Sequence, residues 1–310
     1  MTSKWNKFNL DVNGIGQDNW IKYHFNGNRT RVNPKDNFEV TFTKKATSAP
    51  TFNTACKLVA EELYELNRHQ TIFVPMSGGC DSETVADTFL QLKIPFTPII
   101  HEVWSLGLQL TYADSWWAYR WCKKHNITPI VKNTTTLEMF ADIKPLIDKI
   151  KGRKLYPAQN IILSEFAVQH DGVVINGQAF PEYYPDYTLE YLIDIVNDSG
   201  FFNEDGTKKS GWLLHEDDFY VDMYNPGYHT YNFLSWNPEI VLAYIKERDM
   251  SLNSEENKFK IMKKDPRPKI GAPDAVWHLL KEYQHKLKKQ YGTSELSFIG
   301  THEEMFNILT

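Results

Sequence analysis

The chain has 310 residues, of which 42% are hydrophobic and 14% aromatic, so it can bury a large core and is too apolar for a disordered protein. No stretch is long and apolar enough to cross a membrane, the N-terminus lacks a signal-peptide core, and the three cysteines form no C-x-x-C pair. We therefore expect a cytoplasmic protein without structural zinc or an iron–sulfur cluster, and the net charge of −5 gives no general attraction for nucleic acid.

The sequence divides into three regions. Residues 1–50 form a β-rich segment, in which alternating apolar residues predict strands at 20–25 and 38–42. Residues 51–200 form an α/β region, and residues 201–310 form a C-terminal substrate or lid region.

Helices and strands alternate from residue 53 onward. The apolar face of the first helix contains Ala55, Val59, Leu63 and Leu66. In chain order, the predicted elements are a helix at 53–69, a strand at 71–76, a helix at 83–92, a strand at 96–101, a helix at 113–124, a strand at 127–131, helices at 137–150 and 160–169, a strand at 172–176 and a helix at 240–246 that Asn237 or Ser235 can cap. This alternation predicts an α/β fold with a parallel sheet that carries helices on both faces.

Residues 77–82, Ser-Gly-Gly-Cys-Asp-Ser, lie between a predicted strand and a predicted helix. Glycines let backbone N–H groups approach an anion, and a helix N-terminus adds partial positive charge. Ser77 and Ser82 add hydroxyl donors. A carboxylate repels phosphate, so Asp81 fits this loop if Mg²⁺ lies between it and the phosphates. The alternative is a serine–glycine turn that only caps an ordinary helix.

The pattern S-G-G-x-D-S after a strand resembles the PP-loop of the N-type ATP pyrophosphatases, a branch of the adenine nucleotide alpha hydrolase (HUP-like) superfamily that includes asparagine synthetase and the 7-cyano-7-deazaguanine synthases. The resemblance covers residues 53–180. It implies an enzyme with ATP and Mg²⁺ as cofactors, which splits ATP between the α- and β-phosphates. It also implies that Ser77, Gly78, Gly79 and Ser82 hold pyrophosphate and that Asp81 holds the metal.

Further candidate residues follow from the rule that ligands lie beyond the carboxyl ends of parallel strands. His101 ends a predicted strand at the place where, in the resembling family, backbone reads adenine; the alternative is a partly buried histidine satisfied by backbone. Gly177 follows another predicted strand, and the resemblance implies a role for it near the nucleotide. Glu182 and Asp186 are candidate metal ligands after the same strand, with ordinary surface carboxylates as the alternative.

Residues 258–269 form the one strong basic cluster of the chain. One interpretation is a lid whose Lys263, Lys264, Arg267 or Lys269 meets the pyrophosphate, since charge builds on the leaving group. We assign the catalytic role to Arg267 and Lys269, together with Asp81. The alternative is a solvated basic face.

These features predict an AMP-forming, ATP-dependent ligase that adenylates a carboxylate, amide or carbonyl of a small-molecule substrate for attack by an amine or ammonia. The chain lacks the N-terminal cysteine of the glutamine-hydrolysing members, so ammonia would come from an external source. One alternative is a non-catalytic nucleotide sensor. Another is an enzyme that modifies nucleobases or nucleic acid, with Trp116, Trp117 and Trp121 as a stacking surface. We expect no membrane partner, and nucleic acid is the less favoured partner.

Overall fold

The computed structural model describes residues 16–18, 20–33, 36, 38–43, 50–105, 108–135, 138, 146, 149–150, 158–177, 219–224, 230–235, 237–249 and 251–265. Four predicted site residues lie outside these ranges: Glu182, Asp186, Arg267 and Lys269. Most of the helix predicted at 137–150 also lies outside them. No helix in the described ranges is both long and apolar enough to span a membrane.

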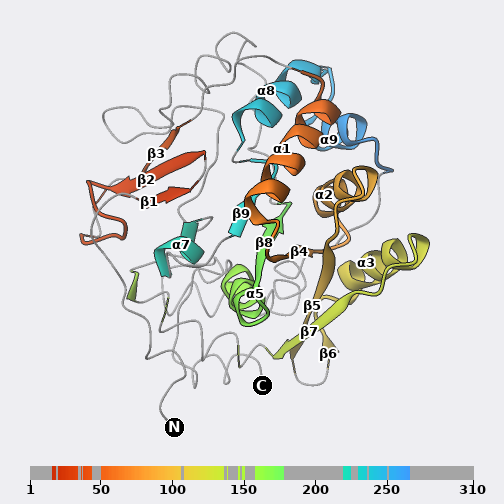
Figure 1. Ribbon diagram of the computed structural model, residues 1–310, viewed down its shortest axis with the longest axis horizontal. Coiled ribbons are helices and arrows are strands. Elements are labelled where there is room, and N and C mark those ends of the chain that lie inside the picture. Colours follow the sequence, from red (N-terminus) through yellow and green to blue (C-terminus); the bar gives the residue numbers. More distant parts are fainter. Residues whose placement is uncertain are drawn as a thin grey trace, which may run out of the picture.

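The N-terminal region contains a small antiparallel sheet, in the order β1-β2-β3 (Figure 1). Its strands are β1 (Gly16–Asp18), β2 (Ile21–Phe25) and β3 (Phe38–Phe42). The structure confirms the strands predicted from the alternating pattern, and β1 was not predicted. The ring of Tyr23 packs on that of Phe219, with centroids 4.7 Å apart, and its hydroxyl donates to Asp222 of helix α7 (Tyr220–Tyr224). These contacts attach the small sheet to the rest of the chain.

The central sheet confirms the predicted parallel α/β fold. Its parallel strands are β4 (Thr71–Pro75), β5 (Thr97–Ser105), β7 (Ile130–Thr135), β8 (Gly172–Asn176) and β9 (Thr230–Asn232), and the short β6 (Leu108–Gln109) runs antiparallel to the end of β5. The parallel strands lie in the order β7-β5-β4-β8-β9. The chain therefore first winds from β4 toward β7 and then winds the other way from β8 to β9. The switch point lies between β4 and β8, where such sheets bind ligands.

Strand β5 is longer than the sequence predicted. We expected it to end at His101, but it runs on to Ser105. Trp104 pairs with Thr135 of β7 and also with Gln109 of β6. A strand has two hydrogen-bonding edges, and β7 occupies one edge of β5. Strand β6 therefore pairs with the other edge, which β4 occupies earlier in the strand, and it lies beyond the end of β4. His101 consequently lies inside the strand and not at its end.

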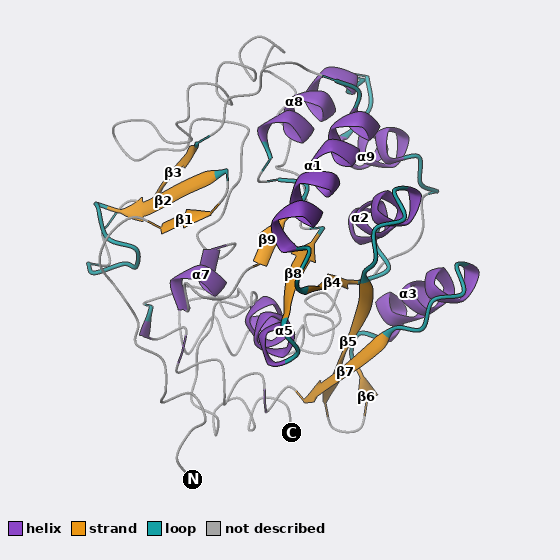
Figure 2. Cartoon of the chain, viewed as in Figure 1, coloured by secondary structure: helices purple, strands orange, loops and turns teal. Residues whose placement is uncertain are grey.

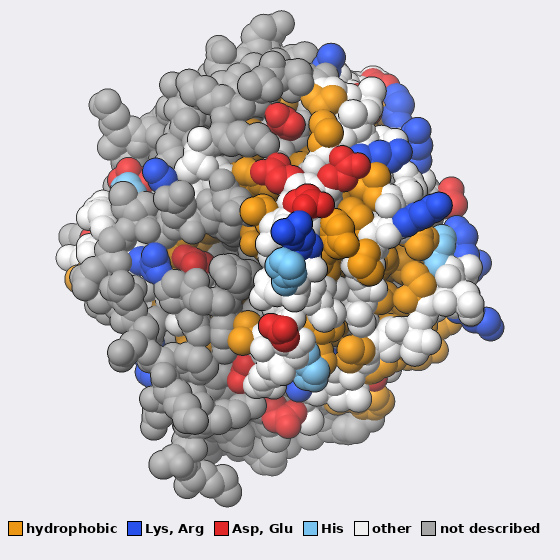
Figure 3. All heavy atoms as spheres, viewed as in Figure 1, with side chains coloured by type: hydrophobic (Ala, Val, Ile, Leu, Met, Phe, Trp, Pro, Cys, Tyr) orange, Lys and Arg blue, Asp and Glu red, His pale blue; other side chains and the backbone are white. Residues whose placement is uncertain are grey.

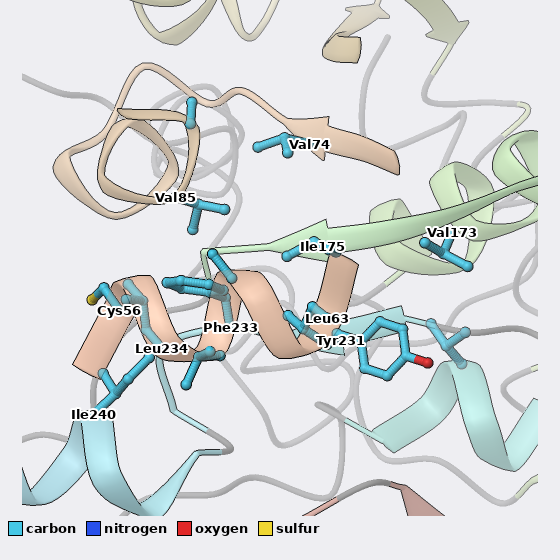
Figure 4. Packing of buried hydrophobic residues seen from close by; sticks show 14 of the residues in the cluster. Cys56, Leu63, Val74, Val85, Val173, Ile175, Tyr231, Phe233, Leu234 and Ile240 are labelled. Carbon is cyan, nitrogen blue, oxygen red and sulfur yellow. The ribbon is translucent and has the colours of Figure 1, made fainter. Parts of the chain in front are cut away.

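Helices cover both faces of the sheet (Figures 1 and 2). Ile72 and Val74 of β4 join the core formed with α1, α2, α3, α8 and α9, whereas Phe73 points to the opposite face, where α5 packs. Figure 4 shows side chains of α1, α2, α8, β4, β8 and β9 meeting in the larger core. The helices are α1 (Phe52–Asn67), α2 (Cys80–Gln91), α3 (Tyr112–Lys124), α5 (Ala158–Gln169), α8 (Pro238–Glu247) and α9 (Ser254–Met262).

The apolar face of α1 was predicted correctly except at its end. Ala55, Val59 and Leu63 are buried, whereas Leu66 is 55% exposed. Leu66 has the right angular position, but it lies in the last turn, where the helix ends and the chain turns back into β4.

Leu63 and Leu66 provide a matched test of this packing. We expect Leu63→Ala to lower the free energy of unfolding by about 2–5 kcal/mol, because it leaves a cavity in the core. Leu66→Ala should change it by less than about 0.5 kcal/mol, because the side chain is largely hydrated already. Urea denaturation of both variants measures the difference, and equal losses would contradict this placement of α1.

Candidate nucleotide site at the sheet switch point

The loop at 77–79 joins β4 directly to α2. The N–H of Met76 still donates to the carbonyl of Ile99 on β5, at 2.7 Å, and Gly79 is the extended N-cap residue of α2. No side chain caps this end of α2. Asp81 and Ser82 lie within the first turn, so the structure does not support the alternative in which they serve as caps. The uncapped N–H groups can donate to an anion.

Gly78 has a conformation and a packing that only glycine satisfies. Its φ is +69°, in the left-handed region. A Cβ at this position would lie 2.5 Å from the carbonyl oxygen of Asp114 and 2.6 Å from Cβ of Trp117. Helix α3 therefore supports the loop from behind with its own backbone.

Gly177 brings the end of β8 against the first turn of α2. A Cβ at Gly177 would lie 2.7 Å from the carbonyl carbon of Asp81 and 2.8 Å from the nitrogen of Ser82. The structure thus brings Gly177 to the loop, as expected for residues that follow the carboxyl ends of parallel strands, and glycine is the residue that allows the contact.

The two serines occupy different environments. Ser82 is buried, donates its hydroxyl to the carbonyl of Gly79 at 3.0 Å, and lies 3.4 Å from the hydroxyl of Ser77. Ser77 is exposed. Ser82 therefore shapes the loop, and Ser77 lies where an incoming ligand can meet it.

Asp81 pairs with a residue that the sequence analysis did not select. Lys258 of α9 donates from Nζ to Oδ2 of Asp81 at 2.5 Å, and both side chains are mostly buried. Burial is the largest single influence on the pKa of the Lys258 ammonium and lowers it, but the charge and hydrogen bond of Asp81, together with Cys80 and Glu255, outweigh burial and raise the pKa overall. On α8, burial raises the pKa of Tyr244, and the Asp81 charge adds to the shift.

A second set of contacts holds the end of α9 against α2. Lys264 pairs with Asp87 and lies 3.8 Å from Glu83. Asp87 also accepts from the indole Nε1 of Trp121 at 2.9 Å. Lys263, by contrast, is exposed and ends the helix in the left-handed conformation.

Whether the basic cluster meets pyrophosphate stays a prediction. Within the described residues, Lys258, which was not selected, and Lys264, which was, reach the first turns of α2 from α9 and the residues just after it. The signal that could have identified α9 is the capping box, in which Asn253 and Glu256 bond to each other's backbone N–H groups.

His101 lies inside its strand. Pro75, the last residue of β4, pairs with Ile99, so His101 lies two residues farther along β5, beyond the end of β4. Its Nε2 lies 3.0 Å from the hydroxyl of Thr134, while Nδ1 is buried and has no partner among the described residues. Burial, with a smaller contribution from Lys132, lowers the pKa of His101 to about 4. The imidazole is therefore neutral at pH 7.

Within the described residues, no group of three or more histidine, cysteine or acidic side chains could hold a metal ion. Of the predicted metal ligands, Asp81 is the one that lies within the described residues, in the first turn of α2. A single carboxylate is compatible with Mg²⁺, which proteins commonly bind through one or two carboxylates together with phosphate oxygens and water.

Comparisons with known proteins add little beyond the fold. No family model and no curated protein matches the sequence. Similar solved structures include NMN synthetase from Francisella tularensis (14% identity, 76% of this chain and 96% of that chain covered, TM-score 0.31), NH₃-dependent NAD synthetase from Campylobacter jejuni (15%, 84% and 94%, 0.31) and U34-tRNA thiolase NcsA from Methanococcus maripaludis (13%, 83% and 80%, 0.35). At these identities and TM-scores, the likeness carries no argument about activity.

The lowered pKa of His101 gives a test of its environment. The unfolded chain binds a proton at this residue below about pH 6.5, whereas the folded chain does so only near pH 4, so stability falls as the pH drops between these values. We expect a slope of up to about 1.4 kcal/mol per pH unit from this group. His101→Gln should remove this contribution, and His69→Gln at an exposed position is the control. Urea denaturation across this pH range gives the slopes, and parallel curves for His101→Gln and the wild type would contradict the assignment.

Proposed function

We propose that the chain is an ATP-dependent ligase that forms AMP and pyrophosphate. The observation that carries the proposal is the arrangement at the switch point. The uncapped start of α2, the glycine loop before it and Gly177 after β8 meet there, with Lys258 at the same turn. At one helix start, the backbone N–H groups and the ammonium can bind the oxygens of a triphosphate, and the carboxylate can bind its metal ion.

In this proposal, Ser77, Gly78, Gly79 and Ser82 bind the β- and γ-phosphates of ATP. Asp81 would hold Mg²⁺, which supplies positive charge to the phosphates when it is bound. Lys258 would then exchange its bond with Asp81 for phosphate oxygens. An ammonium at this position stabilises the charge that develops on the leaving pyrophosphate.

The proposed reaction has two steps. A substrate oxygen attacks the α-phosphorus, the bond to the bridging oxygen of the β-phosphate breaks, and pyrophosphate leaves. An amine or ammonia then displaces AMP from the adenylated carboxylate, amide or carbonyl. Catalysis would come mainly from positioning and charge stabilisation.

Other parts of the proposal rest on the sequence resemblance. His101 and Gly177 would line the nucleotide, Glu182 and Asp186 would add metal ligands, and Arg267 and Lys269 would add to the charge of Lys258. On the same basis, we propose an asparagine-synthetase-like or 7-cyano-7-deazaguanine-synthase-like subtype that uses ammonia from an external source.

The metal role of Asp81 can be tested by Asp81→Asn. The variant keeps the shape of the side chain but removes the charge, so Mg²⁺ should no longer tighten ATP binding, while some metal-free binding remains. Calorimetric titration of ATP with and without Mg²⁺ measures the effect. A Mg²⁺ dependence equal to that of the wild type would assign Asp81 a purely structural role as the partner of Lys258.

The role of Lys258 can be tested against a neighbour on the same helix. Lys258→Gln should lower kcat on the order of 100-fold, because a charge-assisted contact with the leaving group is lost. ATP affinity should change much less, since the contact is strongest in the transition state. Lys260→Gln is the matched control, because Lys260 is exposed and pairs with Asp249, away from the loop. Equal losses in both variants would remove Lys258 from the mechanism.

The reaction class itself is tested with α-labelled ATP, Mg²⁺ and a pool of metabolites. AMP and an adenylated intermediate are the expected products. Tight ATP binding without AMP formation would favour a nucleotide sensor. ADP as the product would contradict the PP-loop assignment.

A further inference from the structure

Helix α3 presents an unusual outer surface. Among its described side chains, the exposed ones are either aromatic (Tyr112, Trp116, Tyr119) or cationic (Arg120, Lys123, Lys124). Its one acidic residue, Asp114, is buried. We call these six residues the α3 face.

The aromatic half of this face stands out from the rest of the molecule. Tyr112 is 64% exposed, Trp116 45% and Tyr119 37%, and the other large exposed hydrophobic residues of the described chain are aliphatic. Aromatic side chains normally contribute to a core, as Trp121 does on the inner side of the same helix. Exposed rings gathered on one helix therefore indicate a binding surface.

The spacing gives the rings a common direction. Tyr112, Trp116 and Tyr119 are four and three residues apart, so they share one side of the helix. With a rise of about 1.5 Å per residue, Tyr112 and Trp116 are about 6 Å apart along the axis, so each ring can be offered to a separate base.

Lys123 continues the same stripe toward the C-terminus of α3, and Arg120 and Lys124 lie to one side of it. Arg120 lies over the rings of Trp116 and Trp117, 5.5 Å from each centroid, which holds a positive charge beside the rings. Lys123 and Lys124 occupy the last turn, where cations also suit the helix dipole. Figure 3 shows Lys and Arg side chains at the right-hand edge, where Figure 1 places the end of α3.

We propose that the α3 face binds a single-stranded nucleic acid segment, with bases stacked on Tyr112 and Trp116 and phosphates next to Arg120 and Lys123. Rings that stack on bases, next to cations that follow a phosphate backbone, are the usual components of such sites. An acidic peptide would pair with the cations, but its carboxylates would not stack on the exposed rings. A duplex would keep its bases stacked and inaccessible to the rings. The proposal needs neither ATP nor the glycine loop, so it stands apart from the proposed ligase activity.

The test is fluorescence anisotropy of a labelled oligouridine with the full chain, without ATP. Trp116→Ala should weaken binding by about tenfold, the effect of losing one base–aromatic stack, whereas Trp116→Phe should retain most of the affinity. Arg120→Gln should weaken binding and reduce the slope of log affinity against log salt by about 0.7. Both positions are exposed, and circular dichroism checks that the variants fold.

Two control variants match these changes on other elements. Leu58→Ala removes an apolar side chain that is 48% exposed on α1, and Lys22→Gln removes a cation on β2, on the opposite side of the molecule from α3 (Figure 1). Both should bind like the wild type. The proposal is overturned if Trp116→Ala binds within twofold of the wild type, if the controls lose as much affinity, or if a duplex or a polyglutamate peptide binds as tightly as the single strand.

Discussion

The contact between Gly177 and the first turn of α2 determines where the candidate site can lie. The end of β8 approaches the backbone of Asp81 and Ser82 so closely that a single added carbon would collide with both. This approach is possible only at the switch point, where β4 and β8 are neighbours although the segment between them includes β5 and β7. The loop, the helix start and the end of β8 are thereby held together by backbone packing.

The ion pair between Asp81 and Lys258 adds the electrostatic part of the site. Each charge is largely removed from water, so either one alone would be costly, and the pair is stable because the two compensate each other. Such a pair contributes little net stability but strongly favours keeping a cation beside Asp81. Lys264, through Asp87, fixes α9 independently at a second point. Helix α9 is thus attached to α2 at two points, so the proposed exchange of partners by Lys258 would not require the helix to move.

The parts that the sequence predicted are those with strong local signals. The helix cap at Asn237, with Pro238 in the first turn, was recognisable because the capping side chain and the helix start are adjacent in sequence. Strand β9 was missed because three residues are too few to show an alternation. Lys258 was missed as a partner of Asp81 because the two are 177 residues apart, and only the tertiary fold brings them together. Leu66 shows the same limit, because the helical pattern gives an angle but not how far the neighbouring elements extend.

Helix α3 connects the two surfaces considered above. Its backbone at Asp114 and Ala118 forms the wall behind Gly78, while its outer side carries the aromatic and cationic α3 face. Trp117 takes part in both, since its Cβ approaches Gly78 and its ring lies edge-to-face with that of Trp116, 4.7 Å between centroids. Because Gly78 has no Cβ, the backbone of α3 lies directly against the loop, and the same helix carries the exposed rings on its outer side.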